Sequence, residues 1–271
     1  MKENEQQEQL TEEEFLELVL EEQQRALAKE REERALGNKR VKRKPFRFRL
    51  IAYIATFVLL VNALALFLEI YSIPAVEFVK TSASLSQQAP IQQAKEAVVE
   101  IRTDDSKGTG FSVSEDGWIL TNAHVVDDAL SLTVSFPSHG IYEATVVASF
   151  PEIDSAFLKI DTQHAPFVSL AQQPTYHADA PITFIGNPLS FSGIANEGTI
   201  QSPIMLKHWS TPVYEMDAPV YKGNSGSPVF NDNMEVIGVV FATTESEKFG
   251  KVGLFVPITH ILQVAPASFP Q

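Results

Sequence analysis

The chain has 271 residues, of which 44% are hydrophobic and 20% are charged, so it can bury a folded core. Its net charge of −13 argues against nucleic acid as a partner, because a polyanion repels an acidic protein. The absence of cysteine excludes disulfide bonds, thiolate metal sites and a cysteine nucleophile. The sequence has neither a His-Glu-x-x-His metal motif nor a Gly-x-x-x-x-Gly-Lys phosphate loop, so we expect no metal and no other cofactor.

Residues 1–37 are rich in Glu and Gln and predict one charged helix that ends at Gly37. Apolar residues gather between Phe15 and Leu20 and then become sparse, which is too uneven for a regular heptad pattern. One interpretation is a solvated charged helix or a partly disordered tail. The other is a helix that binds a partner protein.

The next two segments predict a membrane anchor. Residues 38–49 contain basic residues and no acids, and residues 50–71 supply the ~20 mostly apolar residues that a spanning helix needs. Because basic clusters stay in the cytoplasm, we expect a cytoplasmic amino terminus and an extracytoplasmic carboxyl-terminal part. The apolar stretch is longer than the core of a cleaved signal peptide, which favours an uncleaved, single-pass signal anchor. Asn62 lies in the middle of this stretch. It is either a polar residue that the span tolerates or one that hydrogen-bonds a second helix and favours dimers.

Residues 72–92, which contain Pro74 and Pro90 among Ser, Gln and Ala, are predicted to be a linker. From residue 93 to residue 271, short apolar runs alternate with turn residues, which is typical of an all-β sandwich or barrel. The runs form one set between residues 97 and 160 and a second set between residues 182 and 256. If each set closes on itself, side chains from both sets meet only in the cleft between two barrels.

The run Gly223-Asn224-Ser225-Gly226 lies between two apolar, strand-like segments. Glycines on both sides of a serine allow a tight turn and let backbone N–H groups point at whatever the hydroxyl attacks. The same residues also suit an ordinary turn, because Gly, Asn and Ser are common turn residues. The run by itself therefore leaves both interpretations open.

A serine nucleophile needs a base, and the base needs an orienting acid. Among six histidines, only His124 follows one apolar run and enters another, so the remaining five are interpreted as surface or core imidazoles. Asp154 stands at the start of an apolar strand, where it could also simply end a turn. The order His124, Asp154, Ser225 is nevertheless one of three orders in which such triads are assembled.

Five blocks in this order resemble a trypsin-like serine protease: Gly108–Phe111, Thr121–Val126, Asp154–Ile160, Ile185–Pro188 and Gly223–Pro228. The resemblance covers the chain from about Ala94 to Val264 and is strongest to the bacterial HtrA/Deg group. It implies a double β-barrel with a site in the cleft between the barrels. HtrA/Deg proteins usually carry a PDZ domain after the protease domain. These 271 residues contain none, so we do not expect peptide-activated regulation of that kind.

The resemblance also implies roles for individual residues. His124 corresponds to the base, Asp154 to the orienting acid and Ser225 to the nucleophile. The backbone N–H groups of Gly223 and Ser225 correspond to the donors of the oxyanion hole. Val220, Val240 and Thr243 correspond to the substrate pocket, with Thr243 on the strand that pairs with substrate.

One block departs from the HtrA pattern at Ser227, where that group commonly has glycine, and the run Gly223–Asn231 locally resembles the bacterial glutamyl endopeptidases. Those enzymes bind glutamate with a threonine five residues before the nucleophile and a histidine fifteen after it. Val220 and Val240 occupy these positions and cannot hydrogen-bond a carboxylate, which argues against glutamate specificity. We expect a pocket without a counter-ion for Lys, Arg or Glu, and cleavage after small to medium aliphatic residues.

The sequence therefore predicts a membrane-anchored, extracytoplasmic serine endopeptidase, with protein quality control as a hypothesis for its role. Its expected partners are unfolded protein or peptide substrates and the membrane, through one helix; oligomerisation stays open. Two alternatives remain: a glutamyl-endopeptidase-like protease, and a non-catalytic binding protein built on a protease fold.

Overall fold

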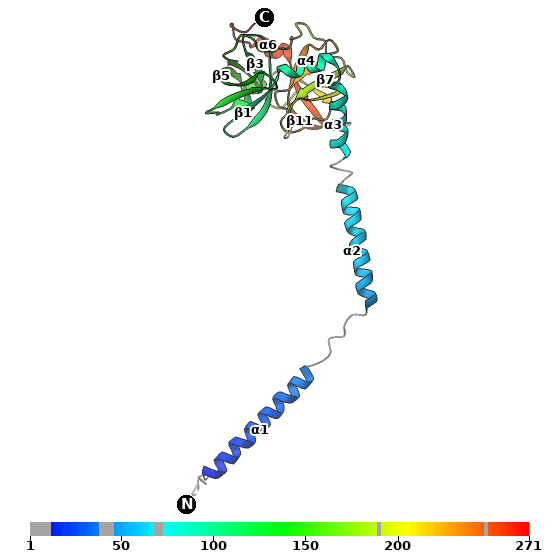
Figure 1. Ribbon diagram of the computed structural model, residues 1–271, viewed down its shortest axis with the longest axis vertical. Coiled ribbons are helices and arrows are strands. Elements are labelled where there is room, and N and C mark those ends of the chain that lie inside the picture. Colours follow the sequence, from blue (N-terminus) through cyan, green and yellow to red (C-terminus); the bar gives the residue numbers. More distant parts are fainter. Residues whose placement is uncertain (1–11, 38–45, 68–72, 189–190, 247–248, 271) are drawn as a thin grey trace, which may run out of the picture. The chain divides into compact units, whose positions relative to one another are not determined.

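The computed structural model describes residues 12–37, 46–67, 73–188, 191–246 and 249–270. The chain divides into two compact units, Met1–Leu66 and Phe67–Gln271. Figure 1 shows long helices in the amino-terminal unit and a β-rich body in the carboxyl-terminal unit.

The amino-terminal unit contains helices α1 (Glu12–Gly37) and α2 (Phe46–Phe67). Phe67, the last residue of α2, is the first residue of the carboxyl-terminal unit. Exposed ion pairs at i,i+4 spacing support α1, with Arg25 2.8 Å from Glu21 and Arg34 2.6 Å from Glu30. In α2, Asn62 Nδ2 donates to the carbonyl of Val58 in the same helix, at 2.8 Å.

The predicted amino-terminal segments lie partly outside the described residues. These missing parts are residues 1–11 of the charged helix, 38–45 of the basic segment and 68–71 of the apolar segment. Among the described residues, no helix is both long enough and apolar enough to cross a membrane. The predicted transmembrane helix at 50–71 is therefore not supported.

The first barrel is closed, with strand order β1-β2-β3-β6-β5-β4. Its strands are β1 (Val98–Thr103), β2 (Lys107–Ser112), β3 (Trp118–Thr121), β4 (Leu132–Phe136), β5 (Gly140–Phe150) and β6 (Ser155–Ile160). A one-turn helix, α5 (Ala123–Val126), follows β3, and a 3-10 helix, η2 (Pro151–Ile153), precedes β6.

The second barrel is also closed, with strand order β10-β11-β12-β9-β8-β7. Its strands are β7 (Pro181–Gly186), β8 (Ile194–Ile204), β9 (Val213–Asp217), β10 (Pro228–Phe230), β11 (Val236–Ser246) and β12 (Gly250–Pro257), followed by helix α6 (Ile258–Gln263). The two barrels use the two sets of apolar runs seen in the sequence. The prediction of an all-β, double-barrel fold is thus confirmed for this unit.

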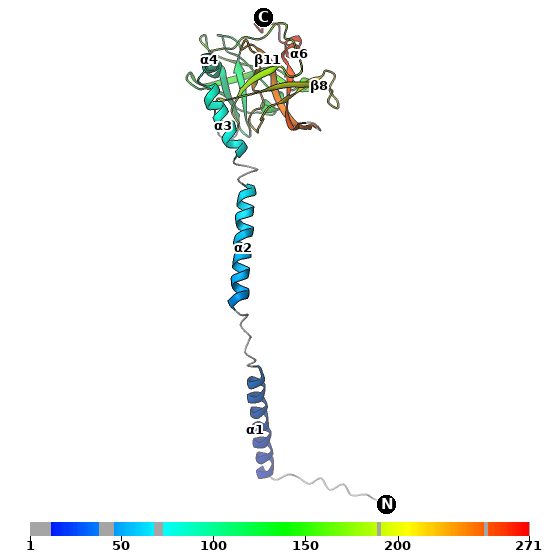
Figure 2. The same ribbon diagram turned by 90° about the vertical axis from the view of Figure 1, so that its right-hand side faces the viewer.

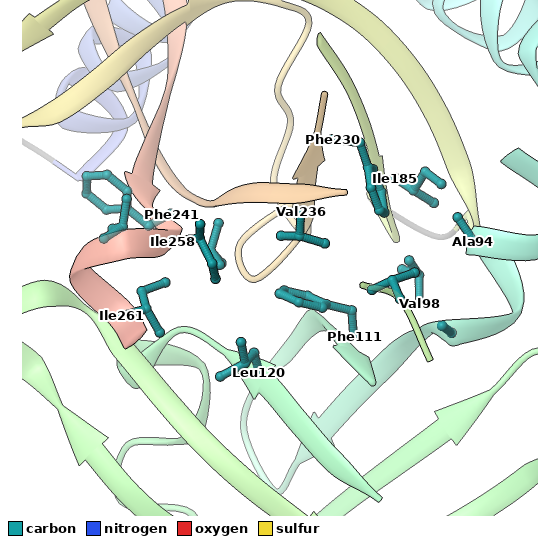
Figure 3. Packing of buried hydrophobic residues seen from close by; sticks show 14 of the residues in the cluster. Ala94, Val98, Phe111, Leu120, Ile185, Phe230, Val236, Phe241, Ile258 and Ile261 are labelled. Atoms are coloured by element: carbon teal, nitrogen blue, oxygen red, sulfur yellow. The ribbon is translucent and has the colours of Figure 1, made fainter. Parts of the chain in front are cut away.

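An apolar seam joins the barrels. Figure 3 shows Phe111 and Leu120 of the first barrel in the same cluster as Phe230 and Val236 of the second. All four side chains are at most 1% exposed. Burial of a large apolar side chain contributes about 1.5–3 kcal/mol, so the seam holds the two barrels, and the loops that they carry, in a fixed relation.

Helices α3 (Ile73–Leu85) and α4 (Ala89–Ala97) occupy most of the segment that the sequence predicts as a linker. Phe78, Ser82 and Leu85 share one face of α3 and are 6%, 4% and 7% exposed. This face lies against β8, where the N–H of Ala195 donates to Ser82 Oγ at 3.1 Å. Figures 1 and 2 show α3 beside the second barrel. The prolines suggested a linker, but each is the second residue of its helix, where proline is tolerated.

Candidate active site

His124 and Asp154 meet at the ends of two paired strands. His124 lies on α5 just after β3, and Asp154 lies between η2 and β6; Thr121 of β3 pairs with Ala156 of β6. Asp154 adopts a left-handed conformation (φ 45°, ψ 50°), which aspartate tolerates better than most residues. This turn directs its carboxylate back toward α5.

Two hydrogen bonds join these residues. Asp154 Oδ2 lies 2.7 Å from His124 Nδ1, and Asp154 Oδ1 accepts the backbone N–H of His124 at 3.0 Å. Asn122 Nδ2 donates to the carbonyl of Asp154 at 2.9 Å and supports the turn. The His124 side chain is 49% exposed and that of Asp154 is 14% exposed. With Nδ1 engaged, Nε2 is the nitrogen left to face solvent or a substrate.

Ser225 lies in the loop between β9 and β10, which depends on two glycines with positive φ: Gly223 at 100° and Gly226 at 86°. A Cβ added at Gly226 would come within 1.8 Å of the Thr109 carbonyl oxygen, so only glycine fits. Thr109 braces the loop: its N–H donates to the Ser225 carbonyl at 2.9 Å, and its Oγ1 donates to the Gly223 carbonyl at 2.7 Å. Asn187 completes the brace by donating its N–H to Thr109 Oγ1 at 2.9 Å.

Ser225 and His124 line one hollow of about 680 Å³, together with Gly223. Ser225 Oγ donates to the Phe241 carbonyl at 3.5 Å, and within the described chain no hydrogen bond joins it to His124. The N–H groups of Gly223 and Ser225 donate to no acceptor among the described residues. In enzymes generally, hydrogen bonds within the active site are often long or poorly aligned before substrate binds.

A second hollow of about 240 Å³ adjoins Ser225 and contains the three predicted pocket residues. Its remaining lining residues are Tyr221, Lys222, Ala242 and Lys251. Val240 is fully buried and Val220 is 8% exposed, whereas both lysines are exposed at the mouth. From the sequence we expect a pocket without a counter-ion, whereas two lysines line this hollow. Lys251 reaches this hollow only because the β11–β12 hairpin places it opposite Glu245, two residues from Thr243, and that register is not evident from the sequence.

Residues 108–239 match the family described as Trypsin-like peptidase domain. The carboxyl-terminal unit is therefore similar to a trypsin-like peptidase domain over these residues. A probable periplasmic serine endoprotease DegP-like from Pseudomonas fluorescens is 32% identical over 167 residues, which is 60% of this chain and 35% of the relative. The chain thus spans about a third of the length of the curated relatives that it matches.

Two solved structures are similar to the peptidase domain. The serine endoprotease from Yersinia pestis has a TM-score of 0.58 and 28% identity, over 65% of this chain and 63% of that one. An inactive form of Rv3671c from M. tuberculosis H37Rv has a TM-score of 0.59 and 28% identity, over 69% of this chain and 95% of that one. The chain therefore shares its double barrel with known serine endoproteases, and its sequence is similar to the DegP/HtrA-like ones.

Gly186 belongs to the fourth sequence block, Ile185–Pro188, and its position leaves no space for a side chain. A Cβ at this position would come within 2.2 Å of Ser227 Oγ and 2.5 Å of Asn224 Oδ1, so glycine makes room for the Ser225 loop. Ser227, where the sequence departs from the HtrA pattern, is fully buried. Within the described chain, its hydroxyl and both polar side-chain atoms of Asn224 have no hydrogen-bond partner.

Charged residues of the first barrel border the larger hollow. Glu100 contacts Lys107 at 2.6 Å and Arg102 at 2.7 Å. Partial burial tends to raise the pKa of Glu100, but the hydrogen bonds and charges of Lys107 and Arg102 outweigh burial, and the pKa is lowered. Asp104 lines the same hollow, and hydrogen bonds from the Ser131 hydroxyl and N–H hold the pKa of this carboxyl below its usual value.

Proposed function

We propose that the chain is a serine endopeptidase of the DegP/HtrA-like kind, with His124, Asp154 and Ser225 as its catalytic residues. The observation that carries this proposal is the 2.7 Å contact between His124 Nδ1 and Asp154 Oδ2, beside a hollow that Ser225 also lines. The similarity to known serine endoproteases supports the same reaction.

The reaction proceeds in two halves. Ser225 Oγ leaves the Phe241 carbonyl, gives its proton to His124 Nε2 and attacks the carbonyl carbon of the scissile peptide bond. His124 then passes this proton to the leaving amine, while Asp154 keeps the imidazole in the required tautomer and stabilises the imidazolium. Water hydrolyses the acyl-enzyme by the same route in reverse order.

Two backbone donors stabilise the negative charge that develops on the substrate oxygen. The N–H groups of Gly223 and Ser225 suit this role because neither is engaged within the described protein. The positive φ at Gly223 and Gly226 shapes the loop that presents them. Removing one such donor in other enzymes costs ~10²–10³ in kcat.

The smaller hollow is the proposed primary pocket. Val220 and Val240 form apolar walls that favour aliphatic side chains by ~0.8 kcal/mol for each buried methylene. Lys222 and Lys251 at its mouth add positive charge, which disfavours substrates with Lys or Arg at the cleaved position. We therefore expect cleavage after Val, Ala, Leu or Ile in extended or unfolded chains, and glutamate is the charged residue best tolerated.

We place the peptidase domain outside the cytoplasmic membrane. The DegP-like relatives are named periplasmic, and in the sequence the basic segment 38–49 precedes the apolar segment 50–71. A tag after Gln271 should be digested by protease added to spheroplasts. Protection of that tag would overturn the location. Carbonate extraction of membranes decides separately whether the apolar segment anchors the chain.

The proposed activity is tested with the purified chain and a fluorophore-labelled unfolded protein. Ser225→Ala should lower turnover by ~10⁴-fold or more, because the hydroxyl carries the chemistry. Ser227→Ala is the matched control: it removes a neighbouring buried hydroxyl that takes no part in the reaction, and it should keep turnover. Near-normal hydrolysis by folded Ser225→Ala would refute the assignment, as would a folded parent protein that binds unfolded substrates without cleaving them.

A further inference from the structure

An aromatic contact connects helix α3 to the loop that carries Ser225. The rings of Phe78 and Tyr221 meet edge to face, with centroids 4.8 Å apart and an interplanar angle of 75°. Phe78 is 6% exposed and Tyr221 is half-buried, so the Phe78 side of the contact is shielded from solvent. Tyr221 in turn lines the smaller hollow beside Ser225.

Tyr221 is also part of the backbone framework of this loop. Its carbonyl accepts the N–H of Asn224 at 3.0 Å, which closes the turn through Lys222 and Gly223. The opposite side of the turn is held by Thr109 Oγ1, which donates to the Gly223 carbonyl. A shift of Tyr221 therefore changes both the wall of the hollow and the turn that presents the proposed oxyanion donors.

Helix α3 is itself docked on the second barrel. Ser82 accepts the N–H of Ala195 in β8 at 3.1 Å, and Leu85 belongs to the apolar cluster that joins the barrels. These anchors hold the carboxyl-terminal half of α3, and Phe78 extends the buried face one turn toward its amino terminus. Figure 2 shows α3 lying along the side of the barrel.

We propose that Phe78 is a positioning residue: through Tyr221, it sets the shape of the primary pocket and of the Ser225 loop. The contact between Phe78 and Tyr221 is then a point at which the activity of the peptidase domain is controlled from outside its barrels. This proposal deepens the proposed function and rests on it. The supporting observations are the ring contact, the burial of Phe78 and the double role of Tyr221 in hollow and turn.

The test compares Phe78→Ala with Leu85→Ala in the full chain. Both variants truncate a buried apolar residue of α3, but Leu85 has no ring contact with Tyr221, so it controls for a general loosening of the helix. Phe78→Ala should lower kcat/KM by about 2- to 12-fold, the range expected for one edge-to-face pair. It should also reduce the discrimination between Val and Leu at the cleaved position. Leu85→Ala should leave kcat/KM per folded molecule and this discrimination unchanged.

A double-mutant cycle shows whether Phe78 acts through Tyr221. In a Tyr221→Ala background, Phe78→Ala should cause no further loss, because the contact is already gone. Phe78→Tyr keeps the ring and should restore activity. If Phe78→Ala does not fold, Phe78→Leu replaces it, because leucine retains apolar burial without the ring. Additive losses, or equal losses in the Phe78 and Leu85 variants, would overturn the proposal.

Hydrogen exchange separates this proposal from the proposed activity. Amide exchange in residues 219–227 should be faster in Phe78→Ala than in Leu85→Ala, and this holds in the inactive Ser225→Ala background as well. If the parent chain cleaves nothing but this difference appears, the positioning role stands and the proposed function fails. If the parent chain is active and exchange is equal in both variants, the positioning role fails alone.

Discussion

At the scale of single residues, the site depends on turns that bring side chains of modest reach together. Asp154 holds His124 by the ring and by the backbone at once, so its left-handed turn fixes both the place and the orientation of the imidazole. Thr109 has a similar double function for the Ser225 loop, through its N–H and its hydroxyl. The chemistry proposed for this site is therefore sensitive to the identity of these atoms, not only to their volume.

Asp154→Asn tests the orienting role. The amide keeps the size of the side chain but cannot hold the same imidazole tautomer, so kcat should fall by ~10⁴-fold. Melting temperature should change little, because the turn and the Asn122 contact to the Asp154 carbonyl remain. A kcat within tenfold of the parent, measured on the folded variant, would mean that Asp154 does not orient the base.

At the scale of elements, the sequence predicted the strands better than the helices around them or the lining of the smaller hollow. His124, Asp154 and Ser225 stand beside apolar runs and glycines, which are local signals. The lysines of the smaller hollow are brought there by strand register and by a loop, which are not local. Helices α3 and α4 were missed because prolines near their starts resemble linker residues, whereas the buried face of α3 depends on the barrel that it covers.

Lys251→Glu tests the charge at the pocket mouth. Because the side chain is exposed, the effect of its charge is screened, and interactions of this kind contribute about 0.2–1 kcal/mol each. Reversing the charge should raise relative cleavage after Lys or Arg by about 2- to 5-fold and lower cleavage after Glu by a similar factor. Lys207→Glu, a change of the same charge outside both hollows, is the control. Identical peptide-library profiles for both variants would show that Lys251 does not face bound substrate.

The pairing of β1 with β2 carries a pH-dependent contribution to stability. Since the folded-state pKa of Glu100 is lowered by Lys107 and Arg102, its charge stabilises the fold above the unfolded-state pKa. This stabilisation is lost as the pH falls through the folded-state pKa. Glu100→Gln should lower Tm at pH 7 by about 2–4 °C, equivalent to ~1 kcal/mol, and by a smaller amount near pH 3. Equal shifts at both pH values would indicate a packing role instead.

At the scale of the whole molecule, the peptidase domain joins two closed barrels across an apolar seam, and the candidate site draws on both. The first barrel supplies His124 and Asp154, and the loop before β10 of the second supplies Ser225. Two sets of strands were visible in the sequence. The prediction that each set closes into a barrel and that the barrels pack together came from the resemblance to trypsin-like proteases. No local pattern encodes how Phe111 of one barrel meets Val236 of the other.

The central claim is that Ser225 is a nucleophile activated by His124, and covalent labelling of the full chain tests it most directly. A fluorophosphonate probe should attach once per molecule, and peptide mapping by mass spectrometry should place it on Ser225. Labelling should vanish in Ser225→Ala and slow by ~10²-fold or more in His124→Ala, because the serine then lacks its base. A folded parent chain that is not labelled, or a variant that is labelled as fast as the parent, would contradict the account.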